Sequence, residues 1–290
     1  MANTRTTANR KAALRAAVKR FKHEHLFLHE PSSLGVTGLF EDKKNGEDRV
    51  ILLYKKGTNT ARLKREAARC FAGFQWKVVE QGGHVFGSAF NGTDAWHDAV
   101  GGHGTVGGWM KDKGGTTVYG LSNNHVIAAI NNGQVGDPIL QGPITIGTLL
   151  TWINLKPMPQ PNKADIALFK LAVGQRPQWD PQRPAGSVGA TQGMRVYKKG
   201  ARSGLTNGIV TGVNGALNVE LHGRMFHFEG LVAIQGDSGA FSEHGDSGSL
   251  VFSVNHFATA ILFAKLDGDS YAYGFPIGAA AALFDGKEWA

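Results

Sequence analysis

The first 80 residues alternate between two hydrophobic periods. Near the start, apolar residues at i, i+3, i+4 and i+7 predict an amphipathic helix with one buried side: Leu14, Ala17, Val18 and Phe21. Two apolar runs follow, at 35–40 (GVTGLF) and 48–56 (DRVILLYKK). The pair Asn45-Gly46 lies between them and is a strong hairpin signal.

A second helical period comes next, and a strand follows it. The second amphipathic helix is predicted by Leu63, Ala67, Cys70, Phe71 and Phe74. Residues 75–81 (QWKVVEQ) then have the composition of a strand. Residues 1–80 are therefore predicted to form a small α+β module.

The pattern changes after this module to short apolar runs at regular spacing, each the length of a strand. The first group occupies 81–175 and includes TVGGWM, TTVYGLSN, ITIGTLLTWI and ADIALFKLAV. A proline-rich stretch at 174–186 separates it from a second group at 186–290, which includes NGIVTGV, SLVFSV and TAILFAKL. Two groups of about six strands favour two antiparallel β-barrels. The predicted fold class is mainly β, with two antiparallel β-barrels preceded by the α+β module.

Charge is concentrated at the start of the chain. The formal net charge is +8, and seven basic residues precede the first acid, Glu24. Setting those seven aside leaves 24 basic residues against 23 acids in the rest of the chain. A nearly neutral body argues against nucleic acid as a partner, because phosphate recognition needs a basic face. The basic helix is interpreted as docked on one side and solvated on the other, with a binding arm as the alternative.

Other sequence features narrow the class of protein. The chain has one cysteine, Cys70, which excludes an internal disulfide and favours a reducing compartment. Since we find neither a secretory signal nor an apolar stretch of membrane-spanning length, we expect a cytoplasmic protein with no membrane partner. His23, His25 and His29 lack spaced partner ligands and are interpreted as surface histidines, so no metal or cofactor is expected.

Three short segments carry candidate chemistry. His125 follows a predicted strand (LSNNHVIA), Asp165 begins another (ADIALFKL), and Ser247 lies on a glycine turn that leads into a third (GDSGSLVF). A serine hydroxyl needs an imidazole to accept its proton and a carboxylate to orient that imidazole. These residues could supply all three parts of a nucleophilic site.

The tetrapeptide GDSG occurs twice, around Ser238 and around Ser247. After Ser247 the chain enters an apolar run long enough for a buried strand, whereas after Ser238 it becomes polar within a few residues. A nucleophile needs an anchored element behind it. We therefore predict Ser247 as the nucleophile and place Ser238 in the turn that ends the LVAIQ strand.

These segments resemble the three triad motifs of trypsin-like serine peptidases of the chymotrypsin fold, including HtrA-type enzymes. The segment 196–213 (VYKKGARSGLTNGIVTGV) also resembles a stretch of the plant narrow-leaf-like peptidases, and the likeness covers roughly residues 100–280. The resemblance implies a serine endopeptidase that forms a covalent acyl-enzyme. His125 would be the general base, Asp165 its orienting partner and Ser247 the nucleophile.

The same resemblance implies an oxyanion hole and a substrate pocket. The hole would be formed by the N–H groups of Gly245 and Ser247, with Asp246 between them. No activation-type N-terminus occurs near residue 100, so Asp246 is predicted to lack the partner that a cleaved zymogen supplies. The pocket would prefer small or apolar side chains of the substrate. It would be formed by Phe241, Ile261, Leu262 and Phe263.

Two alternatives remain open beside a peptidase acting on protein or peptide substrates. A catalytically silent peptide-binding module would keep the fold without the chemistry. A defence or signalling protease held inactive until a partner releases it would give the N-terminal module a regulatory role.

Overall fold

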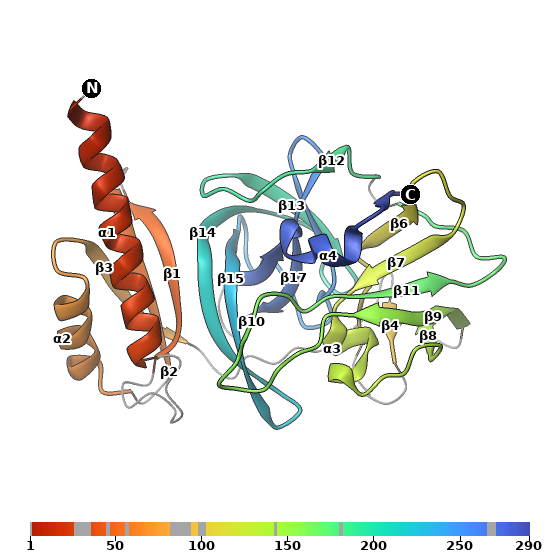
Figure 1. The fold of residues 1–290 in the computed structure, drawn as a ribbon, viewed down its shortest axis with the longest axis horizontal. Helices are drawn as coiled ribbons and strands as arrows, with labels where there is room; N and C mark the ends of the chain where they lie inside the picture. Colours follow the sequence, from red (N-terminus) through yellow and green to blue (C-terminus); the bar gives the residue numbers. More distant parts are fainter. Residues whose placement is uncertain are drawn as a thin grey trace.

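The computed structural model describes most of the chain and confirms the predicted fold class: a mainly β molecule with a small α+β module at its N-terminus (Figure 1). The description covers residues 2–25, 36–44, 47–55, 58–81, 94–97, 103–141, 144–179, 182–265 and 271–290. The predicted turn at Asn45-Gly46 lies outside these residues.

The N-terminal module packs two helices on one face of three strands (Figure 1). Its elements are α1 (Ala2–His25), β1 (Val36–Lys44), β2 (Glu47–Lys55), α2 (Thr60–Cys70) and β3 (Gln75–Gln81). Both predicted helices are present, and most of their apolar positions are buried in one cluster with Val36, Leu39, Val50 and Leu52 of the strands. The second helix is shorter than predicted, because Phe71 and the partly buried Phe74 lie beyond the end of α2. At the start of α2, the side chain of Asn59 accepts a hydrogen bond from the N–H of Arg62 at 3.2 Å.

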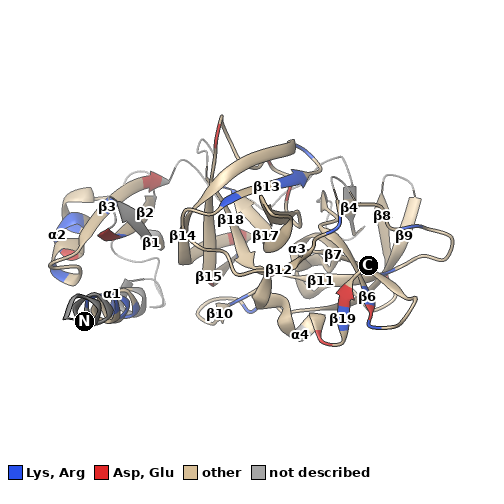
Figure 2. Cartoon of the chain, turned by 90° about the horizontal axis from the view of Figure 1, so that it is seen from above, with Lys and Arg blue, Asp and Glu red and all other residues tan. Residues whose placement is uncertain are grey.

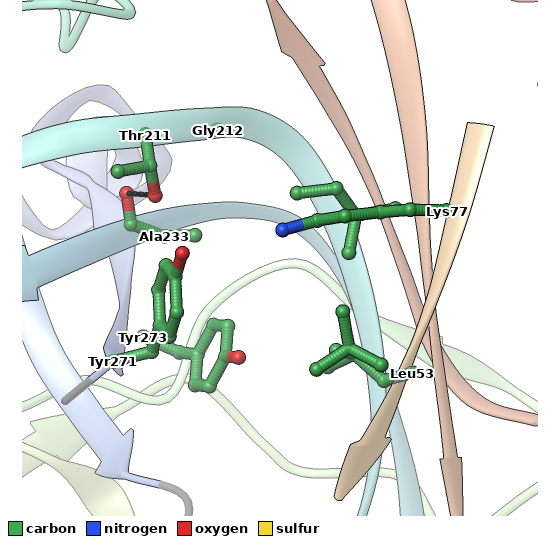
Figure 3. A pocket seen from close by; sticks show the side chains of 9 residues that line it. Leu53, Lys77, Thr211, Gly212, Ala233, Tyr271 and Tyr273 are labelled. Atoms are coloured by element: carbon green, nitrogen blue, oxygen red, sulfur yellow. Dashed lines mark hydrogen bonds between the residues drawn. The ribbon is translucent and has the colours of Figure 1, made fainter. Parts of the chain in front are cut away.

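The strands of this module continue a sheet of the following domain. β1 pairs antiparallel with β2 and also with β14 (Gly204–Leu221), while β3 pairs parallel with β2. Between this extension and the domain lies a small, mainly apolar cavity, where Leu53 and Lys77 face Tyr271 and Tyr273 (Figure 3). Leu53 belongs to the same buried cluster as Leu217, Phe228 and Tyr273. The module and the domain therefore share both a sheet and a hydrophobic core.

An eight-stranded sheet forms the first β domain, in the order β19-β6-β7-β11-β9-β8-β4-β5. Its strands are β4 (Asp94–Trp96), β5 (His103–Thr105), β6 (Gly108–Asp112), β7 (Val118–Ser122), β8 (Pro138–Gln141), β9 (Ile144–Trp152), β11 (Ala167–Leu171) and β19 (Lys287–Trp289). The short helix α3 (Asn124–Ile127) and the turn η1 (Ala129–Asn131) follow β7. Thus β19, which the sequence assigned to the second barrel, pairs with β6 of the first domain.

Six strands of the second domain close into a barrel, because β14 pairs with both β13 and β15. Besides β14, they are β13 (Arg195–Gly200), β15 (Arg224–Gly236), β16 (Leu250–Ser253), β17 (Phe257–Lys265) and β18 (Tyr271–Pro276). The short strands β10 (Pro161–Asn162) and β12 (Gly186–Ser187) pair with β15 and β17, and η2 (Ile277–Ala280) and α4 (Ala281–Phe284) precede β19.

One buried cluster joins the two β domains. It contains Leu121 and Leu168 of the first sheet and Leu250, Phe252 and Ile261 of the second. This shared core brings the end of β7, the start of β11 and the loop before β16 to the same region. None of the described helices is both long enough and apolar enough to cross a membrane.

Candidate active site

His125 lies in the first turn of α3, directly after β7, and Asp165 lies just before β11. The antiparallel pairing of β7 with β11 places Ser122 opposite Ala167. His125, which follows β7, and Asp165, which precedes β11, therefore lie close together. The backbone N–H of His125 donates to Oδ1 of Asp165 at 3.0 Å, and its Nδ1 is hydrogen bonded to Oδ2 of the same carboxylate. Nδ2 of Asn123 donates to the carbonyl of Asp165 at 2.5 Å.

These contacts assign the protonation of the imidazole. A carboxylate accepts hydrogen bonds, so Nδ1 carries the proton that faces Asp165, and Nε2 of the neutral ring is left as an acceptor. Nε2 is buried and has no hydrogen-bond partner within the described residues. The site therefore holds an oriented base with an unused lone pair.

Ser247 lies in the turn that leads into β16. Its Oγ donates to the carbonyl of Phe263 at 3.1 Å, and the ring of Phe263 packs edge-on against the His125 ring, with 6.5 Å between centroids. Phe263 therefore contacts Ser247 through its carbonyl and His125 through its ring. In this conformation the serine hydroxyl is hydrogen bonded to that carbonyl and not to Nε2 of His125.

Thr105 holds the loop that contains Ser247 from the first β domain. Its N–H donates to the carbonyl of Ser247 at 2.7 Å, and its Oγ1 donates to the carbonyl of Gly245 at 2.8 Å. Gly245 has φ of +108° and Gly248 has φ of +95°, a left-handed backbone that favours glycine. Within the described part of the chain, no hydrogen-bond acceptor is found for the N–H groups of Gly245 and Ser247.

Asp246 lies between these two N–H groups and is fully buried, as is Lys198 of β13. Nζ of Lys198 is 2.8 Å from Oδ2 of Asp246. The carboxylate also accepts from Oγ of Ser203 at 2.6 Å and from the backbone N–H groups of Arg202, Ser203 and Glu243. Asp246 therefore has an internal cationic partner, where sequence analysis had predicted only that a zymogen-type partner is missing.

Charge and hydrogen bonding keep Asp246 ionised. Burial acts to raise its pKa, but the Lys198 charge, together with the hydrogen bonds from Lys198, Ser203 and Glu243, outweighs burial and holds the pKa below its ordinary value. For Lys198 burial is the largest influence and lowers the pKa, while Asp246 opposes that shift. We favour the ion pair, because five donors surround the carboxylate.

The sequence alone does not predict this pair, because the burial of Lys198 appears only in the fold. In β13 the side chains of Val196 and Lys198 are both buried, so Lys198 occupies an inward position of the strand. Lysine is rarely fully buried without a partner. Gly200 of the same strand leaves room for the carboxylate, because a Cβ there would lie 2.3 Å from Oδ1 of Asp246.

Ser238, the other GDSG serine, lies apart from these contacts. β15 ends at Gly236, and Ser238 is exposed in the bend that follows. The neighbouring Asp237 is paired with Arg195. Within the described residues, no hydrogen bond links Ser238 to an imidazole.

The four residues expected to form a substrate pocket are all buried and belong to three clusters. Phe241 and Leu262 lie in the core of the second barrel, Ile261 lies between the two β domains, and Phe263 packs with Phe275. Their role in a pocket remains a prediction. Near Ser247, Nζ of Lys265 at the end of β17 forms an ion pair with Glu243 at 2.7 Å.

Metal ligands do not gather near these residues. Across the described parts of the chain, no group of three or more His, Cys, Asp or Glu side chains could hold a metal ion. The donor set at the site consists of one imidazole, one carboxylate and one hydroxyl, with two backbone N–H groups nearby.

No protein-family model matches the chain, and no curated protein matches its sequence. Similar solved structures include Thermobifida fusca protease A (16% identity, TM-score 0.47, covering 70% of this chain and 98% of that one). A glutamic acid specific serine protease is 18% identical, with a TM-score of 0.49 over 69% of this chain and 98% of that one. The chymotrypsin of Cellulomonas bogoriensis is 18% identical, with a TM-score of 0.47 over 71% of this chain and 98% of that one. The roles of individual residues therefore rest on the geometry of this chain.

Proposed function

We propose that this protein is a trypsin-like serine endopeptidase that acts through His125, Asp165 and Ser247. The observation that carries the proposal is the double contact between His125 and Asp165, which orients the ring and leaves its Nε2 without a partner among the described residues. Phe263 contacts both His125 and Ser247. A histidine held by a carboxylate with one acceptor nitrogen open fits a general base.

The mechanism follows from the protons these atoms hold. The Oγ of Ser247 turns from the Phe263 carbonyl to Nε2 of His125, gives up its proton there and forms a bond with the substrate carbonyl carbon. The carbonyl oxygen becomes an anion that the N–H groups of Gly245 and Ser247 can bind. His125 then protonates the leaving amine, which leaves an acyl-enzyme on Ser247. A water molecule then gives a proton to Nε2 of His125 and attacks the acyl carbon, and His125 returns a proton to Oγ of Ser247 as the product acid leaves. Asp165 stabilises the imidazolium each time it forms.

Preference for small or apolar side chains next to the cleaved bond is part of this proposal. Glu243, four residues before Ser247, is the acidic group most able to attract a basic side chain. It is already paired with Lys265, so a preference for Lys or Arg is not expected. We also propose that the enzyme works in the cytoplasm, because a chain with one cysteine, the buried Cys70, cannot form an internal disulfide.

Hydrolysis of a fluorogenic peptide set with apolar, small, acidic or basic residues before the cleaved bond tests the proposal. Ser247→Ala should abolish cleavage of every peptide, and Ser238→Ala should leave it unchanged, which makes the second variant a matched control. Cleavage that survives Ser247→Ala but not Ser238→Ala would reverse the assignment. A folded wild-type protein that binds peptides and cleaves none would favour the silent binding module. Cleavage that appears only after a partner protein is added would favour the regulated protease.

A further inference from the structure

Positive charge covers the outer side of the N-terminal module. Nine basic side chains are exposed on its two helices: Arg10, Lys11, Arg15, Lys19 and Arg20 on α1, and Arg62, Lys64, Arg65 and Arg69 on α2. We call these nine residues the helical basic face. Among the side chains that the structure describes in the two helices, Glu66 is the only acidic one, and it is paired with Arg69 at 2.9 Å.

The fold brings these charges together on one side of the molecule. α1 and α2 cover the same face of the sheet, and the rings of Phe21 and Phe71 pack between them with centroids 5.1 Å apart. The apolar sides of both helices are buried there, and Figure 2 shows basic positions along both helices. Acidic residues of the module lie on its strands, and two of them, Glu41 and Asp48, line the same cavity as Lys11 and Arg15.

Most of these cations have no internal partner. Six of them form no ion pair with any residue that the structure describes: Lys11, Arg15, Lys19, Arg20, Lys64 and Arg65. Some basic residues of the β domains do form such pairs, among them Lys198 with Asp246, Arg195 with Asp237 and Lys287 with Asp112. The helical basic face therefore carries an excess of exposed positive charge, nine basic side chains against one described acid, that an external polyanion could neutralise.

We propose that the helical basic face binds the phosphate backbone of a nucleic-acid duplex, independently of base sequence. Lys11, Arg15 and Lys19 recur every four residues and line one side of α1. From Lys11 to Lys19 these charges span roughly 12 Å of the helix axis, about the rise of three to four base pairs of a duplex. The module would then hold the peptidase on nucleic acid and select substrates that are bound there.

Two other polyanions fit this surface less well. Anionic membranes are bound by helices that also insert apolar side chains, and the large exposed hydrophobic residues in the described chain all lie outside α1 and α2. Single strands are bound by stacking on exposed aromatic rings. In the described part of the two helices, the aromatic side chain is that of Phe21, which is buried.

This inference revises the expectation drawn from charge along the sequence. Counting residues placed the excess charge before Glu24 and left a nearly neutral body. The structure adds the four basic residues of α2 to those of α1, on two helices in which Glu66 is the only acid whose side chain is described. A basic face formed by two packed helices is a stronger phosphate-binding surface than a single terminal arm.

Fluorescence anisotropy with a labelled DNA duplex of about 20 base pairs tests the proposal on the full chain. If five phosphates are contacted, affinity should fall by roughly 500-fold between about 50 and about 200 mM salt. Substituting Lys11, Arg15 and Lys19 by Gln, or Lys64 and Arg65 by Gln, should weaken binding and lower the salt slope by about one for each phosphate that is no longer neutralised. The matched control replaces three exposed basic residues of the first β domain by Gln: Lys113, Lys170 and Arg176.

The control should bind the duplex as wild type does, and all variants should keep peptide hydrolysis, since none alters the proposed triad. Equal loss of binding in the control and the helix variants would overturn the proposal, because net charge alone would then explain it. Tighter binding to single-stranded oligothymidine, or binding to phosphatidylserine vesicles without binding to the duplex, would also overturn it. Because duplex binding does not need Ser247, Ser247→Ala should bind normally even if the proposed peptidase activity is absent.

Discussion

At the residue scale, the pair of Lys198 and Asp246 holds the loop before Ser247 in place. The carboxylate accepts hydrogen bonds from three backbone N–H groups, one of which, that of Glu243, belongs to this loop. Lys198 balances the buried charge of Asp246. The pair thus connects β13 to the residues that would bind an oxyanion.

Removing the cation tests this role. Lys198→Met should destabilise the protein by about 3–5 kcal/mol, because it leaves an uncompensated charge in the core. The double variant Lys198→Met with Asp246→Asn should recover much of that stability, since no charge remains buried. Urea unfolding of both variants measures the difference. If the single variant is as stable as wild type, the pair does not hold the loop.

The same pair predicts a response to acid. Since the folded pKa of Asp246 lies below its ordinary value, the carboxylate contributes stability that is fully present above the unfolded pKa of about 3.9. That contribution is lost as the pH falls through the folded pKa. The unfolding free energy of wild type should therefore fall more steeply below about pH 4 than that of the double variant. Parallel curves for the two proteins would contradict the assignment.

At the scale of elements, the antiparallel pairing of β1 with β14 makes the N-terminal module part of the second barrel's sheet. Gly38 lies opposite Leu217 and Leu39 opposite Ala216. The hydrophobic pattern predicted the strand of β1, because alternation is a local property. It could not predict the pairing with β14, because a strand's partner is chosen by contacts far away along the chain.

This shared sheet predicts cooperative unfolding. Leu53→Ala should cost about 2–5 kcal/mol by opening a cavity in the core that joins β2 to the barrel. Calorimetry should then show a single transition at a lower temperature. The control Val173→Ala alters a fully exposed side chain and should change stability by at most about 0.5 kcal/mol. Two separate transitions, with only one displaced, would show that the module unfolds independently.

At the scale of the whole molecule, some residues of the site can be predicted from the sequence and others cannot. Each of His125, Asp165 and Ser247 sits at the end of a strong apolar run, so each could be selected from its own neighbourhood. Lys198 could not be assigned that way, because its role depends on a carboxylate 48 positions further along the chain. The return of β19 to β6 was equally hidden, since its three residues carry little pattern of their own.

The central claim is that Asp165 and His125 activate Ser247, and the rate of fluorophosphonate labelling tests it most directly. The reagent reacts with an activated serine whatever the natural substrate is, and mass spectrometry of the digested adduct identifies the modified residue. We predict rapid labelling at Ser247 in wild type, and labelling slower by roughly 10⁴-fold in Asp165→Asn, which leaves the imidazole in the wrong tautomer. Equal rates in the two proteins, or an adduct on Ser238, would contradict the account.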